Sequence, residues 1–368
     1  MKRESKIQII IILILVIILG IILAMYFSET NSKNTNMPMQ PKDMNSSNEN
    51  VEAKAVKEVT DTETLSDSYK SSNSDESAIK VLDGGNLTLE NASVEKESGD
   101  STNTENSEFY GVNSGILTTK ESTTTIKDSE ITTNAKGANA VFATGENAKV
   151  YVYNTKIKTT GESSSRGLDS TYGGYIEADN VEISTQGGSC ATLATDRGEG
   201  TVIARNSKLS TAGAGSPIIY STGEITLENS EGNATGSQMC VIEGKNTATI
   251  SDSNLKCSGK GNRNNVDNAG IMIYQSMSGD AGEGTGTLNA TNSTLEIASD
   301  SNYYNTAPFF FITNTKAIIN LENNTLKYGS NLLLKVGATR RMGKRRRKWW
   351  RSYFKCKKST TWWKYRSR

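Results

Sequence analysis

The chain has 368 residues, 41 basic and 40 acidic, with 32 glycines, 4 prolines and no histidine. The absence of histidine excludes histidine-based nucleophilic catalysis and histidine metal sites, and with them most hydrolase mechanisms. The near-neutral charge is an average, because 14 of the basic residues and none of the acidic ones lie in 340–368, which leaves 27 basic against 40 acidic residues before that point.

The N-terminus predicts a membrane anchor. Residues 7–27 are almost uninterruptedly apolar, and about 20 such residues span a bilayer as a helix. Lys2, Arg3 and Lys6 precede this run, so residues 1–6 are expected in the cytoplasm and the remainder outside the cell. A cleaved signal peptide, the alternative, would have a shorter apolar region followed by small residues. We therefore expect a single-pass protein of the cell membrane with an extracellular C-terminal part.

A polar segment follows the apolar run. Residues 28–77 are mostly Asn, Ser, Lys, Glu, Asp and Thr. Such a composition buries too little apolar surface to offset the entropy lost on ordering, so it predicts a disordered stalk.

Residues 78–339 contain an internal repeat. A β-prone triplet is followed by Asp or Asn, a small residue and an aliphatic residue, and the Asp/Asn positions are spaced by 26, 26, 26, 23, 23, 40 and 31 residues. These positions are Asp128, Asn154, Asn180, Asn206, Asn229, Asp252, Asn292 and Asn323. A period in the twenties built from short strands is typical of a solenoid. The step of 40 indicates an insertion, expected as a loop around Gly279–Gly286.

A second phrase alternates with the first, as in Ala140–Thr144, Gly167–Thr171, Ala191–Thr195 and Ile218–Thr222. Each unit therefore holds at least two short strands, which bury a face only when they stack on the next unit. The predicted fold is all-β, a single-stranded right-handed parallel β-helix with an N-terminal transmembrane helix.

The Asp/Asn column has two interpretations. Asn and Asp tolerate left-handed turns and hydrogen-bond to nearby backbone, so stacked copies predict a structural turn ladder. A calcium ladder is the alternative; we otherwise expect no cofactor, no metal site and no catalytic residue. Cys190, Cys240 and Cys257 are expected as buried apolar fillers rather than disulfides.

A ligand-binding patch is expected on the second strand of each unit and the turn after it. Asp169 aligns with Phe142, Leu193 and Tyr220, so this column should point outward if Leu168 points inward. Aromatic rings and charged groups on a flat sheet suit sugar rings and hydroxyl groups; solvated charges beside glycine turns are the simpler interpretation. The candidate residues are Arg166, Asp169, Tyr172, Asp196, Arg197 and Tyr220.

Three segments carry a resemblance to a known family. Ala138–Gly145, Ser165–Gly174 and Ala194–Gly200 resemble adhesin-like right-handed β-helix surface proteins of anaerobic bacteria. The resemblance covers about Ile79–Gly337 and extends distantly to cell-surface β-helix proteins that bind polysaccharides. It implies a non-catalytic role in adhesion or glycan binding, with the membrane and either a polysaccharide or a host or neighbouring cell surface as partners and no nucleic acid. A β-helix polysaccharide lyase or glycoside hydrolase and a structural spacer are the alternatives.

The basic, tryptophan-rich tail, residues 340–368, is predicted to be frameshifted. Written in A-rich codons, Arg345–Arg351 becomes Glu-Glu-Glu-Asn-Gly-Gly-Glu when read one base later, which resembles another turn of the repeat. We then expect the tail to have no core and to leave the strands of the last coil unpaired. A natural tail that binds wall polyanions, membranes or nucleic acid is the alternative.

Overall fold

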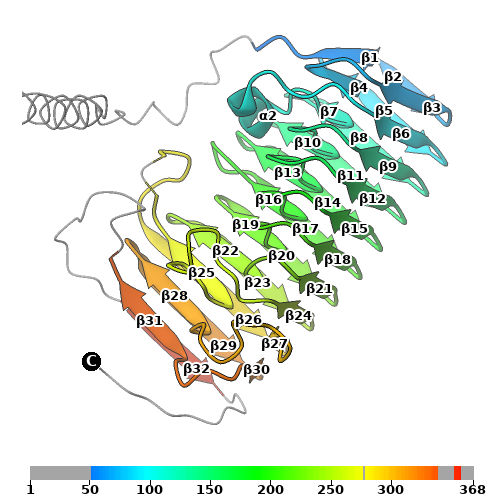
Figure 1. Cartoon of the computed structure of the whole chain (residues 1–368). Coiled ribbons are helices and arrows are strands. Elements are labelled where there is room, and N and C mark those ends of the chain that lie inside the picture. Colours follow the sequence, from blue (N-terminus) through cyan, green and yellow to red (C-terminus); the bar gives the residue numbers. More distant parts are fainter. Residues whose placement is uncertain (1–50, 277, 339–351, 358–368) are drawn as a thin grey trace, which may run out of the picture. The chain divides into compact units, whose positions relative to one another are not determined.

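The computed structural model describes residues 51–276 and 278–338, together with the backbone of 352–357. These residues form three parallel sheets and one short helix, α2 (Thr104–Tyr110) (Figure 1). The predicted transmembrane segment 7–27 and most of the tail lie outside the described residues. Within the described part of the chain, no helix is long and apolar enough to cross a membrane.

The strands fall into three sheets, A, B and C. Sheet A contains β1 Lys54–Val59, β4 Glu76–Val81, β7 Ile116–Thr118, β10 Val141–Thr144, β13 Leu168–Thr171, β16 Leu193–Thr195, β19 Ile219–Ser221, β22 Cys240–Glu243, β25 Ile271–Tyr274, β28 Phe310–Thr313 and β31 Leu334–Gly337. Sheet B contains β2 Thr62–Leu65, β5 Asn86–Glu90, β8 Thr123–Lys127, β11 Lys149–Tyr153, β14 Tyr175–Asp179, β17 Thr201–Arg205, β20 Glu224–Glu228, β23 Thr247–Ser251, β26 Thr285–Thr291, β29 Lys316–Glu322 and β32 Ser352–Lys357. Sheet C contains β3 Ser68–Ser71, β6 Ser93–Lys96, β9 Glu130–Thr133, β12 Lys156–Thr159, β15 Glu182–Thr185, β18 Lys208–Thr211, β21 Glu231–Ala234, β24 Asn254–Cys257, β27 Thr294–Ile297 and β30 Thr325–Lys327.

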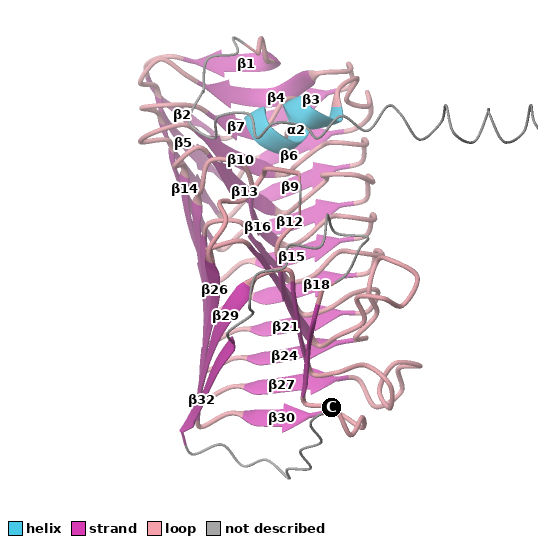
Figure 2. Cartoon of the chain, turned by 90° about the vertical axis from the view of Figure 1, so that its left-hand side faces the viewer, coloured by secondary structure: helices cyan, strands magenta, loops and turns pink. Residues whose placement is uncertain are grey.

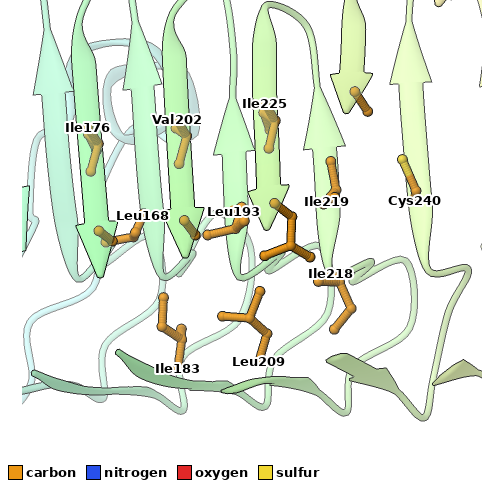
Figure 3. Packing of buried hydrophobic residues seen from close by; sticks show 14 of the residues in the cluster. Leu168, Ile176, Ile183, Leu193, Val202, Leu209, Ile218, Ile219, Ile225 and Cys240 are labelled. Carbon is orange, nitrogen blue, oxygen red and sulfur yellow. The ribbon is translucent and has the colours of Figure 1, made fainter. Parts of the chain in front are cut away.

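Each coil contributes one strand to each sheet. Every strand pairs in parallel with the strands three places before and after it in the chain, and Figure 2 shows the resulting stack of coils. The predicted parallel β-helix is therefore confirmed, with three strands per coil. Alternate side chains of every strand point inward, so that Ile176 lies next to Val202 in sheet B and Ile183 next to Leu209 in sheet C. These aliphatic columns meet in the centre of the stack and form the core (Figure 3).

The repeated Asp/Asn position lies at the turn between sheets B and C. All eight predicted residues have positive φ, and Asn91 adds a ninth with φ 51°. Amide groups donate from coil to coil, as from Asn154 to Asp128 at 3.0 Å and from Asn180 to Asn154 at 2.8 Å. The series deviates at Asn206, whose amide donates to Asp179 instead. Side chains that tolerate the left-handed region and bond to the next coil explain this column without a bound cation.

A second ladder of hydroxyl groups lies one residue further on. The Ser207 and Ser230 hydroxyls each donate to the carbonyl two residues earlier, and Ser230 also accepts the backbone N–H of Ser207. Ser253 repeats the pattern on the next coil. The small residue of the repeat is therefore a buried hydrogen-bonding group, which satisfies the turn amides that the strands leave unpaired.

The first coil lies where a disordered stalk was expected. Residues 54–71 form β1, β2 and β3, so the stalk prediction is wrong for the described part of 28–77. Lys57, Glu63 and Tyr69 pair in register with inward-facing aliphatic residues of the second coil. Lys57 and Glu63 form a 2.6 Å ion pair, with each side chain about one-third exposed. Among the described residues this coil has a neighbour on one side only, and the polar groups at its inward positions cover that end of the core, which gives it a composition like that of a stalk.

A buried lysine closes one corner between the first two coils. The Lys96 side chain is fully buried, and its ammonium group donates to the Ser71 hydroxyl and to the carbonyls of Asn73 and Glu76. Burial lowers the pKa of Lys96 to about 8. The carbonyls at this corner therefore have a buried hydrogen-bond partner.

The long coils and the tail also differ from expectation. The 40-residue step contains two loops, residues 258–270 and 275–284, rather than one. Within the tail, β32 pairs with β29 along six residues, so the expectation that the last coil would lack a partner is wrong for sheet B. In sheet A the last strand is β31, where Val336 is 45% exposed.

The turn ladder can be tested at Asn180. Asn180→Ala should lower the free energy of unfolding by about 2 kcal/mol, because alanine is strained at φ 54° and loses the bond to Asn154. Asn180→Gly removes the same hydrogen bond without the strain and should cost about 1 kcal/mol. The shift of the urea midpoint measures both, and equal losses for the two variants would contradict a role for the left-handed backbone.

Candidate ligand-binding site

The outward column of sheet A is neither uniformly polar nor exposed. In register it runs through Leu117, Phe142, Asp169, Ala194, Tyr220, Val241, Met272 and Phe311. The partner of Asp169 is Ala194, one residue later than predicted, because Leu193 pairs with Leu168 and points inward. The column is apolar at both ends and charged in the middle, so segments outside the coils must cover its apolar parts.

Helix α2 covers the N-terminal end of this column (Figures 1 and 2). The Asn103 side chain caps the helix, and Gly111 ends it at φ 68°. The Phe109 carbonyl accepts the Thr171 hydroxyl at 2.8 Å, which holds the end of the helix against β13. Val112 packs with Leu117 and Phe142 beneath it. The helix is therefore a fixed wall that places Glu108 beside the centre of the column.

The two inserted loops cover the other end. In loop 258–270, the Asp267 carboxylate accepts the backbone N–H groups of Asn262 and Arg263 at 3.1 and 2.8 Å. Ala269 packs on Met272 in the same apolar cluster as Phe311. Loop 275–284, in which residue 277 is not described, supplies Asp280. The long coils thus form the second wall opposite the helix.

A buried ion cluster occupies the centre. Arg166 contacts Asp169 at 2.6 Å through Nη1 and Asp196 at 2.7 Å through Nη2, and all three side chains are at most 7% exposed. Burial raises the pKa of Asp196 to about 8, although the charge of Arg166 opposes the shift, and burial also raises the pKa of Asp169. Since one guanidinium serves two carboxyl groups, we expect one proton to be retained on this pair near neutral pH. Asp169 Oδ1 is buried and accepts no hydrogen bond of ordinary geometry from a described residue.

A second buried carboxyl lies further along sheet A. Glu243 accepts the hydroxyls of Tyr220 at 2.9 Å and Tyr274 at 2.5 Å, and the N–H of Ser276 at 3.1 Å. Burial raises the pKa of Glu243, and burial with the nearby carboxyl also raises the pKa of both tyrosines. The Tyr220 ring lies 5.6 Å from the Arg166 guanidinium carbon, so the two clusters are continuous.

Arg197 joins the two walls across the column. Its guanidinium carbon lies 3.7 Å from the centroid of the Phe109 ring, and its Nη2 lies 2.8 Å from Asp280. On the turn between β13 and β14, Tyr172 stacks on Tyr110 with ring centroids 5.5 Å apart. Arg197 and Tyr172 therefore hold α2 and loop 275–284 in place.

Between the walls lies a pocket of about 240 Å³. Its floor is the outer face of sheet A, and its walls are α2 and the two inserted loops. It is lined by Glu108, Arg166, Ser189, Ala191, Asp196, Gly215, Pro217, Tyr220, Gln238, Val241, Asn262, Arg263, Asp267, Met272, Tyr274 and Asp280. The lining combines apolar carbon, two aromatic rings and charged groups, as expected for a site that binds a small polar molecule.

The six predicted residues thus lie in one cluster. Arg166, Asp196 and Tyr220 line the pocket. Asp169 lies behind Arg166, while Tyr172 and Arg197 contact the walls. Three of the six, Arg166, Asp169 and Asp196, are buried, in contrast to the interpretation as solvated surface charges.

The wall residues Glu108 and Asp280, and Glu243 with Tyr274, were not among the predicted residues. The signal for Asp280 was the 40-residue step. The signal for Glu108 was another long step, 37 residues from Asn91 to Asp128, which the predicted series did not include.

Neither calcium nor a thiol site has support among the described residues. They contain no group of three or more His, Cys, Asp or Glu side chains arranged to hold a metal ion. Cys190, Cys240 and Cys257 are free and buried, and burial raises the pKa of the Cys190 thiol to about 11. Comparison with protein families, with characterised proteins and with solved structures returns no match for this chain.

The ion cluster predicts a pH-dependent effect of Arg166→Met. The variant should lower the free energy of unfolding by about 3–5 kcal/mol at pH 8, because two buried carboxyl groups lose their counter-charge. Since the folded pKa of Asp196 already lies above its unfolded value, the folded state binds the extra proton, and stability falls as pH rises toward 8. Without Arg166 these pKa values rise further, so the loss should be smaller at pH 5, where both groups hold protons.

Arg205 provides a matched control. It also bridges two carboxylates, Glu177 at 2.5 Å and Glu228 at 2.7 Å, but it is 35% exposed. Arg205→Met should cost about 1 kcal/mol or less. Urea unfolding at pH 5 and pH 8 measures both variants, and similar losses for the two arginines would refute the buried-cluster interpretation.

Proposed function

We propose that the protein is a cell-surface β-helix that binds a saccharide in the pocket on the outer face of sheet A. The observation that carries this proposal is the pocket itself. It is walled by three separate segments, has a Tyr220 ring beside a methionine, and has charged groups in its lining. Aromatic and methionine carbon suits the apolar face of a sugar ring, while carboxylate, guanidinium and amide groups suit its hydroxyls.

Contacts within the protein already hold the walls of the pocket in place. Arg197 ties the two walls together through Phe109 and Asp280, and the Thr171 hydroxyl holds the helix to the sheet. A site whose walls are already in place loses little conformational entropy when it binds, which favours affinity for a small ligand.

A glycoside hydrolase is the second candidate, and Asp196 is the observation that favours it. A buried carboxyl group with a pKa of about 8 beside a pocket has the protonation state of a general acid at neutral pH. However, both of its oxygens have internal partners, Oδ2 with Arg166 and Oδ1 with the Arg197 N–H. We therefore favour non-catalytic binding.

The location is proposed from the sequence. Residues 7–27 and the basic residues before them favour a membrane anchor, with a right-handed β-helix presented outside the cell. The resemblance to adhesin-like surface proteins supports the same arrangement, with a polysaccharide or another cell surface as the partner.

Tyr220 tests the binding site. In a glycan-array screen followed by calorimetry, Tyr220→Ala should weaken binding of the best glycan at least about 10-fold, because the aromatic ring against which the sugar packs is lost. Tyr220→Phe keeps the ring and should retain most of the affinity. Tyr151→Ala, on the outer face of sheet B, is the matched control, since it removes a tyrosine from outside the pocket. Equal affinity for Tyr220→Ala and the unchanged protein would place the ligand elsewhere.

Protease treatment of intact cells tests the anchor. Cleavage between residues 28 and 50 should release the β-helix into the medium, while the N-terminal segment stays in the membrane fraction. Recovery of a mature protein that already begins near Ser28 in untreated medium would show a cleaved signal peptide instead.

A further inference from the structure

The pocket contains more acidic than basic groups. Its charged groups come from each element around it. The carboxyl groups are Glu108 from α2, Asp169 and Asp196 from the floor, Glu243 from β22, Asp267 from loop 258–270 and Asp280 from loop 275–284. The guanidinium groups are Arg166, Arg197 and Arg263. The pocket therefore has six carboxyl groups and three guanidinium groups in or next to its lining.

Two of the three bases are already paired with carboxyl groups. Arg166 is buried between two carboxyl groups, and Arg197 is held by Asp280 and the Phe109 ring. Only Arg263, half-buried on loop 258–270, makes no salt bridge with a described residue. On the acidic side, Glu108 accepts the Ser164 hydroxyl at 2.5 Å and forms no salt bridge with a described residue. The lining therefore presents one carboxyl group, Glu108, and one guanidinium, Arg263, without a salt bridge to a described residue, in a pocket whose acids outnumber its bases.

The acids come from different elements around one cavity. Glu108 from α2, Asp196 from the floor and Asp280 from loop 275–284 all line it, and the charges of Asp280 and Glu108 add to the effect of burial in raising the pKa of Asp196. A buried oxygen of Asp169, without an ordinary hydrogen bond, lies behind the same cluster. This crowding of like charge is relieved by a cation and made worse by an anion.

We propose that the pocket selects an amine-bearing saccharide, such as a glucosamine oligomer, and excludes uronates. The inference rests on the proposed saccharide-binding function. The ligand ammonium lies among Glu108, Asp196 and Asp280, while the sugar ring contacts Tyr220 and Met272. A uronate carboxylate in the same place loses its hydration and meets three carboxyl groups, which costs affinity.

Binding of the ammonium is coupled to release of a proton. The cation favours the ionised form of Asp196, which otherwise retains its proton up to a pKa of about 8. Arg166, Asp169, Asp280 and Glu108 are the other charged groups that act on it. As long as the ligand amine stays charged, its affinity therefore rises as pH increases from 6 toward 7.

Three matched trimers test the selectivity by calorimetry at pH 6, where the ligand amine is charged, and at low salt: glucosamine, N-acetylglucosamine and galacturonic acid. The glucosamine trimer should bind at least about 10-fold more tightly than its N-acetylated counterpart, and the galacturonic acid trimer should not bind. Titration in buffers of different ionisation enthalpy should show proton release for the glucosamine trimer only. Raising the salt concentration should weaken that trimer selectively.

Glu108→Gln provides the site-specific test, because it keeps the size and the acceptor for Ser164 but removes the charge. It should weaken the glucosamine trimer about 5-fold or more and leave the N-acetylated trimer within about 2-fold. Glu182→Gln, exposed on β15, is the matched control and should change neither.

The outcomes separate the two proposals. Equal or tighter binding of the N-acetylated trimer, or binding of the uronate trimer, overturns the selectivity and leaves saccharide binding in place. The same holds if only neutral or acidic glycans bind in an array. Absence of binding to any glycan overturns both proposals.

Discussion

The structure depends on in-register stacking of coils. Each strand donates and accepts backbone hydrogen bonds with the coils on either side, so a side chain that points inward in one coil lies against an inward side chain in the next. A short strand such as β16, with three residues, has no stability of its own and gains it only from its two neighbours. The core is consequently narrow and continuous, and residues of similar type must recur at each level.

The same constraint creates the site. A strand that points one side chain inward must point the next one outward, so sheet A presents a second column on its outer face. Where that column contains Phe142 or Met272, it requires a cover, and the chain provides one by lengthening the connections of two coils. The pocket lies at the central part of the column, between the cover from α2 and the cover from the inserted loops.

The charged centre has a cost that the surrounding structure offsets. Burying Arg166 with Asp169 and Asp196 removes three ionisable groups from water, and such clusters contribute little net stability compared with apolar packing. Arg205 makes the same kind of bridge on the surface of sheet B, where water screens it. The repeat accepts apolar residues at the equivalent positions 142 and 194, so the fold itself does not require a charge at position 169.

Most of the fold was predictable from the sequence because stacking repeats local patterns. Asn180 and its equivalents indicated the turn, and the alternation in Ile176 and Ala178 indicated the strand, since turn geometry and strand periodicity depend on neighbouring residues. The first described coil was not predicted because Lys57 and Glu63 replace aliphatic residues of the repeat there. The sequence by itself also placed Arg166, Asp196 and Tyr220 on one face, through their position in the repeat. Only the tertiary structure brought Glu108 and Asp280 to that face, because they belong to irregular connections whose path depends on the surface they cover, and it was this cover that turned expected surface charges into a buried site.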